Sequence, residues 1–191
     1  MLTAALGLCV AAEVGAGPPT DQVREYTDRV IKVLEDPALK GDGKRPERRA
    51  TVRKIAVEIF DVAEAAKRAL GRHWQARTAA ERTEFVELFA DLLERAYVSK
   101  IDLYGGERVR YVGESIDGDF AAVRARITTK RDAEIPVEAR MLRRGERWLI
   151  YDISVEGISL VNNYRSQFDK IIQSSSYEEL TRRMKAKRDG T

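Results

Sequence analysis

The hydrophobic pattern of this chain changes its period once, at Gly105-Gly106. Before the glycine pair, apolar residues recur at every third or fourth position, which is typical of amphipathic helices. Over residues 107–156 they alternate with charged residues, which is typical of antiparallel strands with one solvated face. Helices followed by a meander of strands predict an α+β fold. In it, N-terminal helices pack on one face of a curved antiparallel sheet, and a C-terminal helix follows the sheet.

Three helices are expected before the sheet. The apolar pattern places the first at residues 20–35 and the second at residues 46–70, where Gly71 stops it. The third opens with the capping box Thr78-x-x-Glu81 and continues to residue 104, either as one helix or through a second helix that follows directly.

Each expected strand points one set of side chains toward the helices and the other toward solvent. The outward set has mixed charges, which solvate the sheet and pair across strands. The inward set is Val109, Tyr111, Gly113, Ala121, Val123, Ala125, Ile127, Ile135, Val137, Ala139 and Met141, and the outward set is Arg110, Glu114, Arg124, Arg126, Glu138 and Arg140.

The inward set contains unusually small residues, including one glycine and three alanines. Protein interiors pack as densely as organic crystals, so this lining cannot fill a wide space by itself. Either large side chains such as Trp74, Phe85 and Phe89 fill it, or a bound ligand does. The pattern leaves both alternatives open.

Groups that perform chemistry are scarce in the sequence. The inward strand positions carry no ionisable group except Tyr111, and the single histidine, His73, has no partners at metal-ligand spacing and reads as a turn or packing residue. Asp152, if buried, is expected to bind backbone amides where the sheet meets the next helix. We therefore expect no catalytic residues, no metal and no cofactor, and an enzyme with a lone buried carboxylate is the alternative.

The two chain ends differ from the body. Residues 1–16 hold an apolar run followed by small residues, which is typical of a secretory signal peptide, although no basic residue precedes the run. We expect one mature domain at residues 17–191, with a basic, flexible tail at residues 182–191. That tail holds most of the excess positive charge, so the body lacks the basic stripe of a nucleic-acid binder. An adaptor that binds nucleic acid through the tail is a further alternative.

Two segments resemble a known family. RWLIYDISVEGISLVNNYRSQFDKII, residues 147–172, matches the patterns W-x-[VI]-[YF]-D-[VI], E-G-[VI]-S-L-V and N-Y-R-x-x-F of the MlaC family, periplasmic phospholipid-binding proteins also called toluene-tolerance ABC-transporter auxiliary components. LGRHWQARTAAERTEFVELFADLLERAY, residues 70–97, is similar to the L-G-x-x-W and F-x-x-L-L-x-x-x-Y segments of the same family.

The resemblance implies a cone-shaped, NTF2-like fold with a central apolar cavity. It also implies a periplasmic lipid carrier that is not an enzyme and moves its cargo between an outer-membrane lipoprotein complex and an inner-membrane ABC transporter complex. Relatives encoded with hopanoid synthesis share the signature, so the cargo implied is a phospholipid or a hopanoid. Burying a methylene group is worth about 0.8 kcal/mol, which explains why acyl chains need shelter in water.

The candidate lipid-binding residues combine the inward strand positions with aromatic and apolar residues of the matched segments. Residues around Ile158 form an apolar corner between strand and helix, and we expect them to close one wall or the mouth of the cavity; the alternative is a helix that simply covers the core. The full set is Tyr97, Tyr104, Val109, Tyr111, Val123, Val137, Ala139, Met141, Trp148, Ile158, Leu160, Tyr164 and Phe168.

Overall fold

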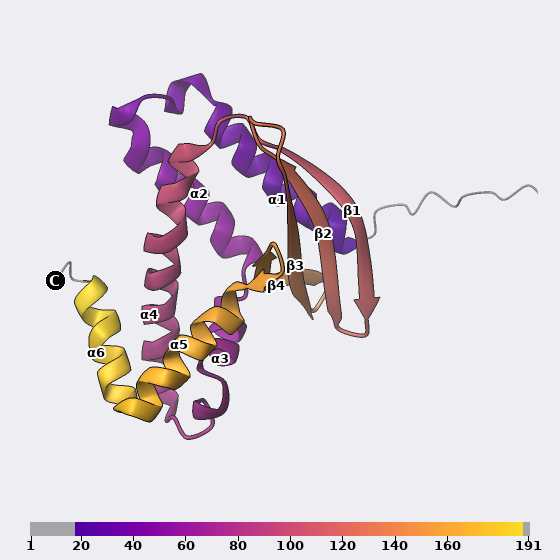
Figure 1. Ribbon diagram of the computed structural model, residues 1–191. Coiled ribbons are helices and arrows are strands. Elements are labelled where there is room, and N and C mark those ends of the chain that lie inside the picture. The colour runs from indigo at the N-terminus through magenta and orange to yellow at the C-terminus, as the bar shows by residue number, and fades with distance from the viewer. Residues whose placement is uncertain (1–17, 189–191) are drawn as a thin grey trace, which may run out of the picture.

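The computed structural model describes residues 18–188 and shows helices packed against a five-stranded sheet (Figure 1). The predicted α+β fold is confirmed, with the helices before the sheet and two more after it. The helices are α1 (Pro18–Glu35), α2 (Arg45–Ile59), α3 (Val62–Leu70), α4 (Ala79–Tyr97), α5 (Leu160–Ser174) and α6 (Tyr177–Arg188). The strands are β1 (Arg108–Asp117), β2 (Phe120–Thr128), β3 (Glu134–Arg144), β4 (Arg147–Val155) and β5 (Ile158–Ser159).

The sheet is an antiparallel meander in the order β1-β2-β3-β4-β5. Its predicted outward charges pair across strands, since Glu134 accepts hydrogen bonds from Arg110 and Arg126. One prediction about the faces is wrong. A bulge between Tyr111 and Gly113 shifts the register, so Glu114 lies opposite Val123 on the inner face. There its carboxylate accepts hydrogen bonds from the backbone N–H and hydroxyl of Thr20, at 3.0 and 2.5 Å, in the first turn of α1.

The second predicted helix is in fact two helices. The chain is extended at Phe60, whose backbone forms a parallel bridge with Ile150 of β4, and Asp61 then caps α3 by accepting a hydrogen bond from the N–H of Glu64. The apolar pattern continues across the break with no Gly or Pro to mark it. The prediction of one helix over residues 46–70 was therefore wrong, because the break depends on a contact with a strand far along the chain.

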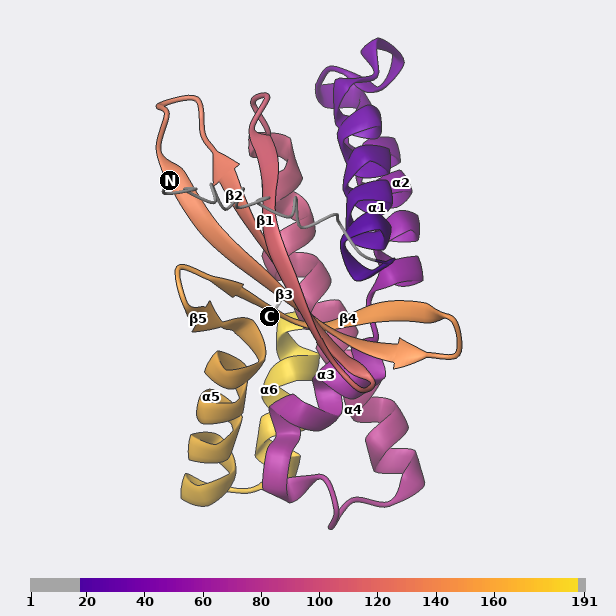
Figure 2. The ribbon, with the colours of Figure 1, turned by 90° about the vertical axis from the view of Figure 1, so that its right-hand side faces the viewer.

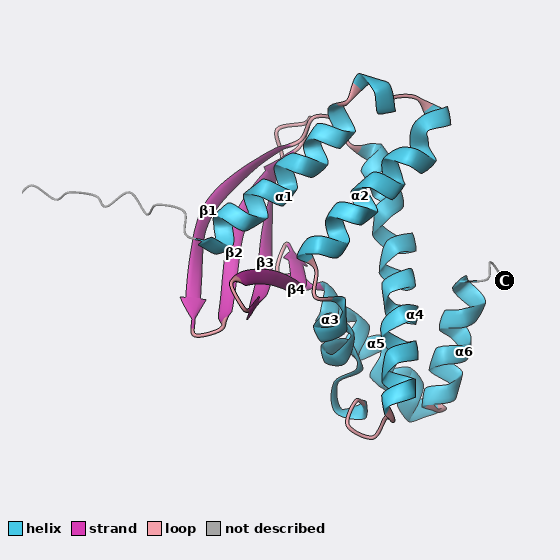
Figure 3. Ribbon diagram, turned by 180° about the vertical axis from the view of Figure 1, so that it is seen from behind, coloured by secondary structure: helices cyan, strands magenta, loops and turns pink. Residues whose placement is uncertain are grey.

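The helices form two groups (Figures 1 and 3). α1 and α2 lie along the inner face of the sheet, with α1 contacting β1, β2 and β4. α3, α4, α5 and α6 pack together as a bundle at one end of the sheet. Figure 2, which views the molecule from the sheet side, shows α4 behind the strands, so one face of the sheet is turned toward that helix.

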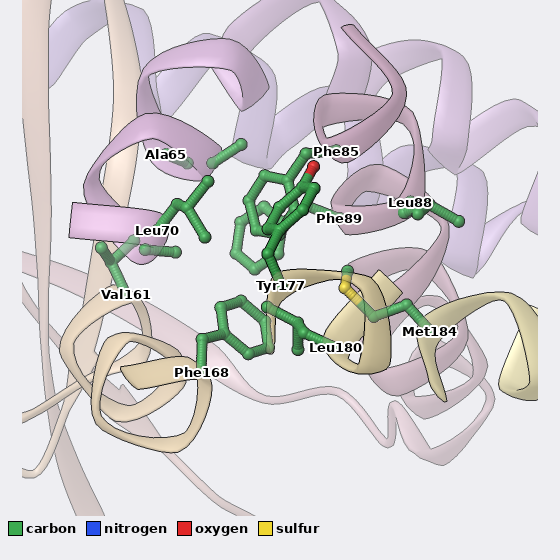
Figure 4. Packing of buried hydrophobic residues seen from close by; sticks show 12 residues of the cluster. Ala65, Leu70, Phe85, Leu88, Phe89, Val161, Phe168, Tyr177, Leu180 and Met184 are labelled. Atoms are coloured by element: carbon green, nitrogen blue, oxygen red, sulfur yellow. The ribbon is translucent and has the colours of Figure 1, made fainter. Parts of the chain in front are cut away.

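The hydrophobic core is divided in the same way. The bundle core contains Phe85, Phe89 and Phe168, whose rings meet edge to face at 5.7–6.0 Å between centroids, together with Tyr177 and Leu180 (Figure 4). The sheet core is a separate cluster of residues from α2 and the inner strand positions. It consists of Ile59, Ala121, Val123, Ala139, Met141, Trp148 and Ile150, with Val23 and Tyr26 of α1 packed against it.

The basic C-terminal residues are largely ordered, which corrects the prediction of a flexible tail. Residues 182–188 belong to α6, where Met184 is buried against α4 and Lys185 pairs with Glu84 of that helix at 2.5 Å. Arg182 and Arg183 both bind Glu179 one turn earlier. The predicted signal segment, residues 1–16, and the last three tail residues lie outside the described part of the chain.

A buried carboxylate holds the corner between β4 and α5. Asp152 is almost fully buried and accepts hydrogen bonds from the Ser159 hydroxyl at 2.6 Å and from the Val161 backbone N–H at 3.0 Å. The Ser159 hydroxyl in turn accepts from the N–H of Asn162 and so caps α5. The expected binding of backbone amides by Asp152 is confirmed, and the carboxylate fixes the direction in which α5 leaves the sheet.

Asp152→Ala is expected to lower the free energy of unfolding by about 1–3 kcal/mol, because it leaves the Val161 N–H and the Ser159 hydroxyl buried without their acceptor. Chemical denaturation measures the change. The control is Arg124→Ala on the solvated face, where a change within about 0.5 kcal/mol is expected. Equal losses in the two variants would contradict this role for Asp152.

Candidate functional site

Apolar side chains that neither core buries lie on the inner face of the sheet. Val109, Ile127 and Ile135 form a row across β1, β2 and β3, because the register places each opposite the next. Val137 and Val155 form a second row on β3 and β4. All five are half-buried except Val155, which is 44% exposed. The sheet core therefore ends before the strands do, and this remaining apolar area has no hydrophobic cluster on it.

Residues from α4 and α5 border the same space on the bundle side. Figures 1 and 3 show α4 standing across from the strands, with a gap between their ribbons. Leu93 of α4 and Tyr164 of α5 are half-buried at the edge of the bundle core, and Leu160 is half-buried at the start of α5. Tyr97, at the end of α4, is 43% exposed. These side chains supply an apolar wall that faces away from the bundle interior.

Two tyrosines meet in this wall. Burial raises the pKa of Tyr164 to about 12, and the nearby hydroxyl of Tyr97, with which it shares a hydrogen bond, raises this pKa further. The ring of Tyr164 packs edge to face on Phe89, with 5.5 Å between centroids. The pair thus joins α4 to α5 and places two hydroxyl groups in an otherwise apolar wall.

The thirteen predicted site residues fall into three groups. Val123, Ala139, Met141 and Trp148 are closed within the sheet core, and Phe168 is closed within the bundle core. Tyr104 and Tyr111 lie beside α1, where the Tyr104 hydroxyl donates to Glu35 and Arg24 stacks on the Tyr111 ring. The remaining six border the open apolar space or its rim, and they are Tyr97, Val109, Val137, Ile158, Leu160 and Tyr164.

The predicted apolar corner is a tight hairpin turn. Glu156 and Gly157 both have positive φ, at 51° and 81°, as the two central residues of such turns require, and Val155 pairs with Ile158 across them. The Ile158 side chain is 69% exposed, so it lies at a rim and not in a wall. Val161 points the other way and is buried in the bundle core.

Sequence reasoning missed several residues of this surface. Ile127 and Ile135 were placed on the inner face but not among the site residues, while Leu93, Ile153 and Val155 were not considered for the site. The two-residue period identifies the strand members. It cannot identify which of them the helices leave uncovered.

The other candidate chemistry proves structural. His73 contacts Asp169 of α5 at 2.7 Å, which together with Arg72 lowers the pKa of that carboxyl and ties the segment after α3 to α5. Among residues 18–188 no three His, Cys, Asp or Glu side chains come together in a way that could hold a metal ion. In the same range, no helix combines the length and the apolar character needed to cross a membrane.

The fold and this surface define a cone-shaped α+β protein whose apolar inner face extends beyond its own packed cores. The family model described as "MlaC protein" matches residues 24–186, so the chain belongs to the MlaC family. The predicted family is thereby confirmed.

Two relatives are informative. The chain is 21% identical over 141 residues to the intermembrane phospholipid transport system binding protein MlaC of Haemophilus influenzae, a match that spans 71% of this chain and 66% of that protein. A solved structure of a phospholipid-binding protein from Ralstonia solanacearum, in complex with a phospholipid, superposes with a TM-score of 0.79. It is 21% identical, and the match covers 91% of this chain and 98% of the other.

The tyrosine pair predicts a pH dependence. A tyrosine whose pKa rises on folding stabilises the protein fully below its unfolded value of about 10 and loses that contribution as pH climbs toward the folded value. For Tyr164 the folded value is about 12, so the free energy of unfolding should fall from pH 10 to pH 12. In Tyr164→Phe the fall should be shallower, as measured by urea denaturation across this range.

Tyr177, whose pKa burial also raises to about 12, provides the comparison. Tyr177→Phe should flatten the curve similarly, and the double variant should flatten it most. A curve for Tyr164→Phe that parallels the unchanged protein would contradict the burial of this hydroxyl.

Proposed function

We propose that this protein is a periplasmic lipid carrier that holds the acyl chains of a phospholipid between the inner face of the sheet and the α4–α5 wall. One observation carries the proposal. Phe85 and Phe89, the side chains expected to fill the space over the small-residue sheet, are fully buried in the bundle core instead. The apolar strand residues beyond the sheet core thus lack a protein filler among residues 18–188.

The chemistry of the lining supports an acyl ligand. Val109, Val137 and Leu160 offer aliphatic contact and no charge, and the ionisable inner-face residue Glu114 is already bound by Thr20. Apolar area removed from water is worth about 25 cal/mol per Å², so covering this lining with hydrocarbon stabilises both the ligand and the protein. The Tyr97–Tyr164 pair provides hydroxyl groups toward which a polar part of the lipid can be oriented.

The relatives support the same function. One is named for phospholipid transport between membranes and the other was solved with a phospholipid, and both belong to proteins of this fold. Transport between membranes requires a carrier that crosses the periplasm. We propose that this chain receives and delivers its cargo at an outer-membrane lipoprotein complex and an inner-membrane ABC transporter complex. A hopanoid is the alternative cargo, since its apolar body makes the same demand on the lining.

Native mass spectrometry of gently purified protein tests the proposal. We expect about one lipid molecule per chain, because a single continuous apolar area is available between the two cores. Extraction and identification of the bound molecule distinguish a phospholipid from a hopanoid. Protein that is uniformly empty when isolated from a lipid-rich periplasm would contradict the carrier function.

A substitution can block the space directly. Val137→Trp should weaken lipid retention by about tenfold or more, since its ring would occupy the space of an acyl chain. Its effect on the free energy of unfolding should stay below about 1.5 kcal/mol, because the side chain enters open space and not a packed core. Ala139→Trp is less suitable, since Ala139 lies within the sheet core.

The matched control is Arg124→Trp, which places the same ring on the outer face of the neighbouring strand. It should retain lipid normally. Equal loss of lipid in both variants would mean that the ligand does not lie on the inner face.

A further inference from the structure

A hollow on the surface of the bundle is separate from the proposed lipid site. It lies between α3 and α5 and has a volume of about 320 Å³. Its lining comes from the end of α3, the segment after it, and one residue of α5. The residues are Glu64, Lys67, Arg68, Gly71, Trp74, Gln75 and Arg165.

The charge of the hollow is predominantly positive. Glu64 is its single acid, and this carboxylate already contacts Arg68 at 2.8 Å, Lys67 at 3.6 Å and Arg144 at 3.7 Å. Arg165 is exposed and, among residues 18–188, has no ion-pair partner. The hollow thus presents cationic groups in excess of the acid available to neutralise them.

The position of Arg165 is built into the backbone. Gly71 has a φ of +57°, and a Cβ atom there would lie 2.7 Å from Nε of Arg165 and 3.4 Å from its Cζ. A side chain at residue 71 would therefore collide with the guanidinium group, which lies directly against the glycine. This contact limits the freedom of a long side chain before any ligand binds, and such pre-organisation lowers the entropy cost of recognition.

The surroundings suit a carboxylate from a protein. Arg165 offers a planar fork of N–H donors, and the half-buried Trp74 offers an apolar surface beside it, the two residue types most enriched at energetically important contacts. A second hollow, of about 500 Å³, continues along α5 and adds Lys170. A concave, elongated surface with cations fits an extended chain better than it fits a flat bilayer.

We infer that the surface from Lys67 and Trp74 to Arg165 and Lys170 docks an acidic segment of a protein partner, with Arg165 binding a carboxylate. Nothing in the lipid-binding proposal requires this surface, which lies on the outer side of the bundle. Docking should depend on ionic strength, because the cations are exposed and screened by salt.

The test uses the full chain, labelled with ¹⁵N, and acetyl-hexaglutamate amide as the probe. Titration at low ionic strength should shift the NMR signals of the Gly71 amide and the Trp74 indole in a saturable way. Arg165→Glu should weaken binding by about tenfold or more, the effect expected when a charged hydrogen bond is replaced by repulsion. The same charge change at the exposed position Lys54 of α2 is the control and should alter affinity by less than about twofold.

Gly71→Ala provides a second variant, since it displaces Arg165 while keeping every charge. It should weaken binding of the probe in protein whose circular dichroism is unchanged. Vesicles of phosphatidylglycerol form a parallel arm. Equal losses in Arg165→Glu and Lys54→Glu, shifts that map away from this surface, or a preference for vesicles over the peptide would each overturn the inference. Lipid content, measured on the same samples, reports separately on the carrier function.

Discussion

The hydrogen bonds of the Asp152 carboxylate connect the two halves of this molecule. Asp152 belongs to the sheet, and its acceptor oxygens bind Ser159 and Val161 at the start of α5. Because a buried carboxylate must be fully bonded, this corner permits one direction for the helix that follows. That direction places Phe168 in the bundle core, Tyr164 at the edge of the apolar space, and Arg165 against Gly71 on the outer surface.

Local patterns were sufficient to predict the sheet and its faces. The two-residue period of β2 and β3 survives in the structure, where Val123, Ala139 and Met141 point inward as expected. It failed where the register changes. The bulge before Gly113 turns Glu114 inward, and the sequence contains no unambiguous signal for it beyond the glycine itself.

Contacts between distant segments were beyond the reach of the same reasoning. The break at Phe60 depends on Ile150 of β4, about ninety residues later, and no local residue announces it. The candidate site shows the same limit. Helical spacing correctly marked Phe85 and Phe89 as buried, but whether they would cover the sheet or pack with Phe168 depends on how α4 and α5 meet. The site residues that remain accessible could be predicted as apolar, not as uncovered.

The two places where the chain passes between the cores near β4 have a mechanical consequence. The N–H of Asp61 donates to the carbonyl of Ile150 at 2.8 Å, and two residues further along the same strand Asp152 holds α5. Both attachments of the bundle therefore lie side by side on one strand, and they define an axis of rotation. Turning the bundle about this axis would change the width of the apolar space while each core keeps its packing. The geometry of β4 thus sets how thick a cargo can be enclosed.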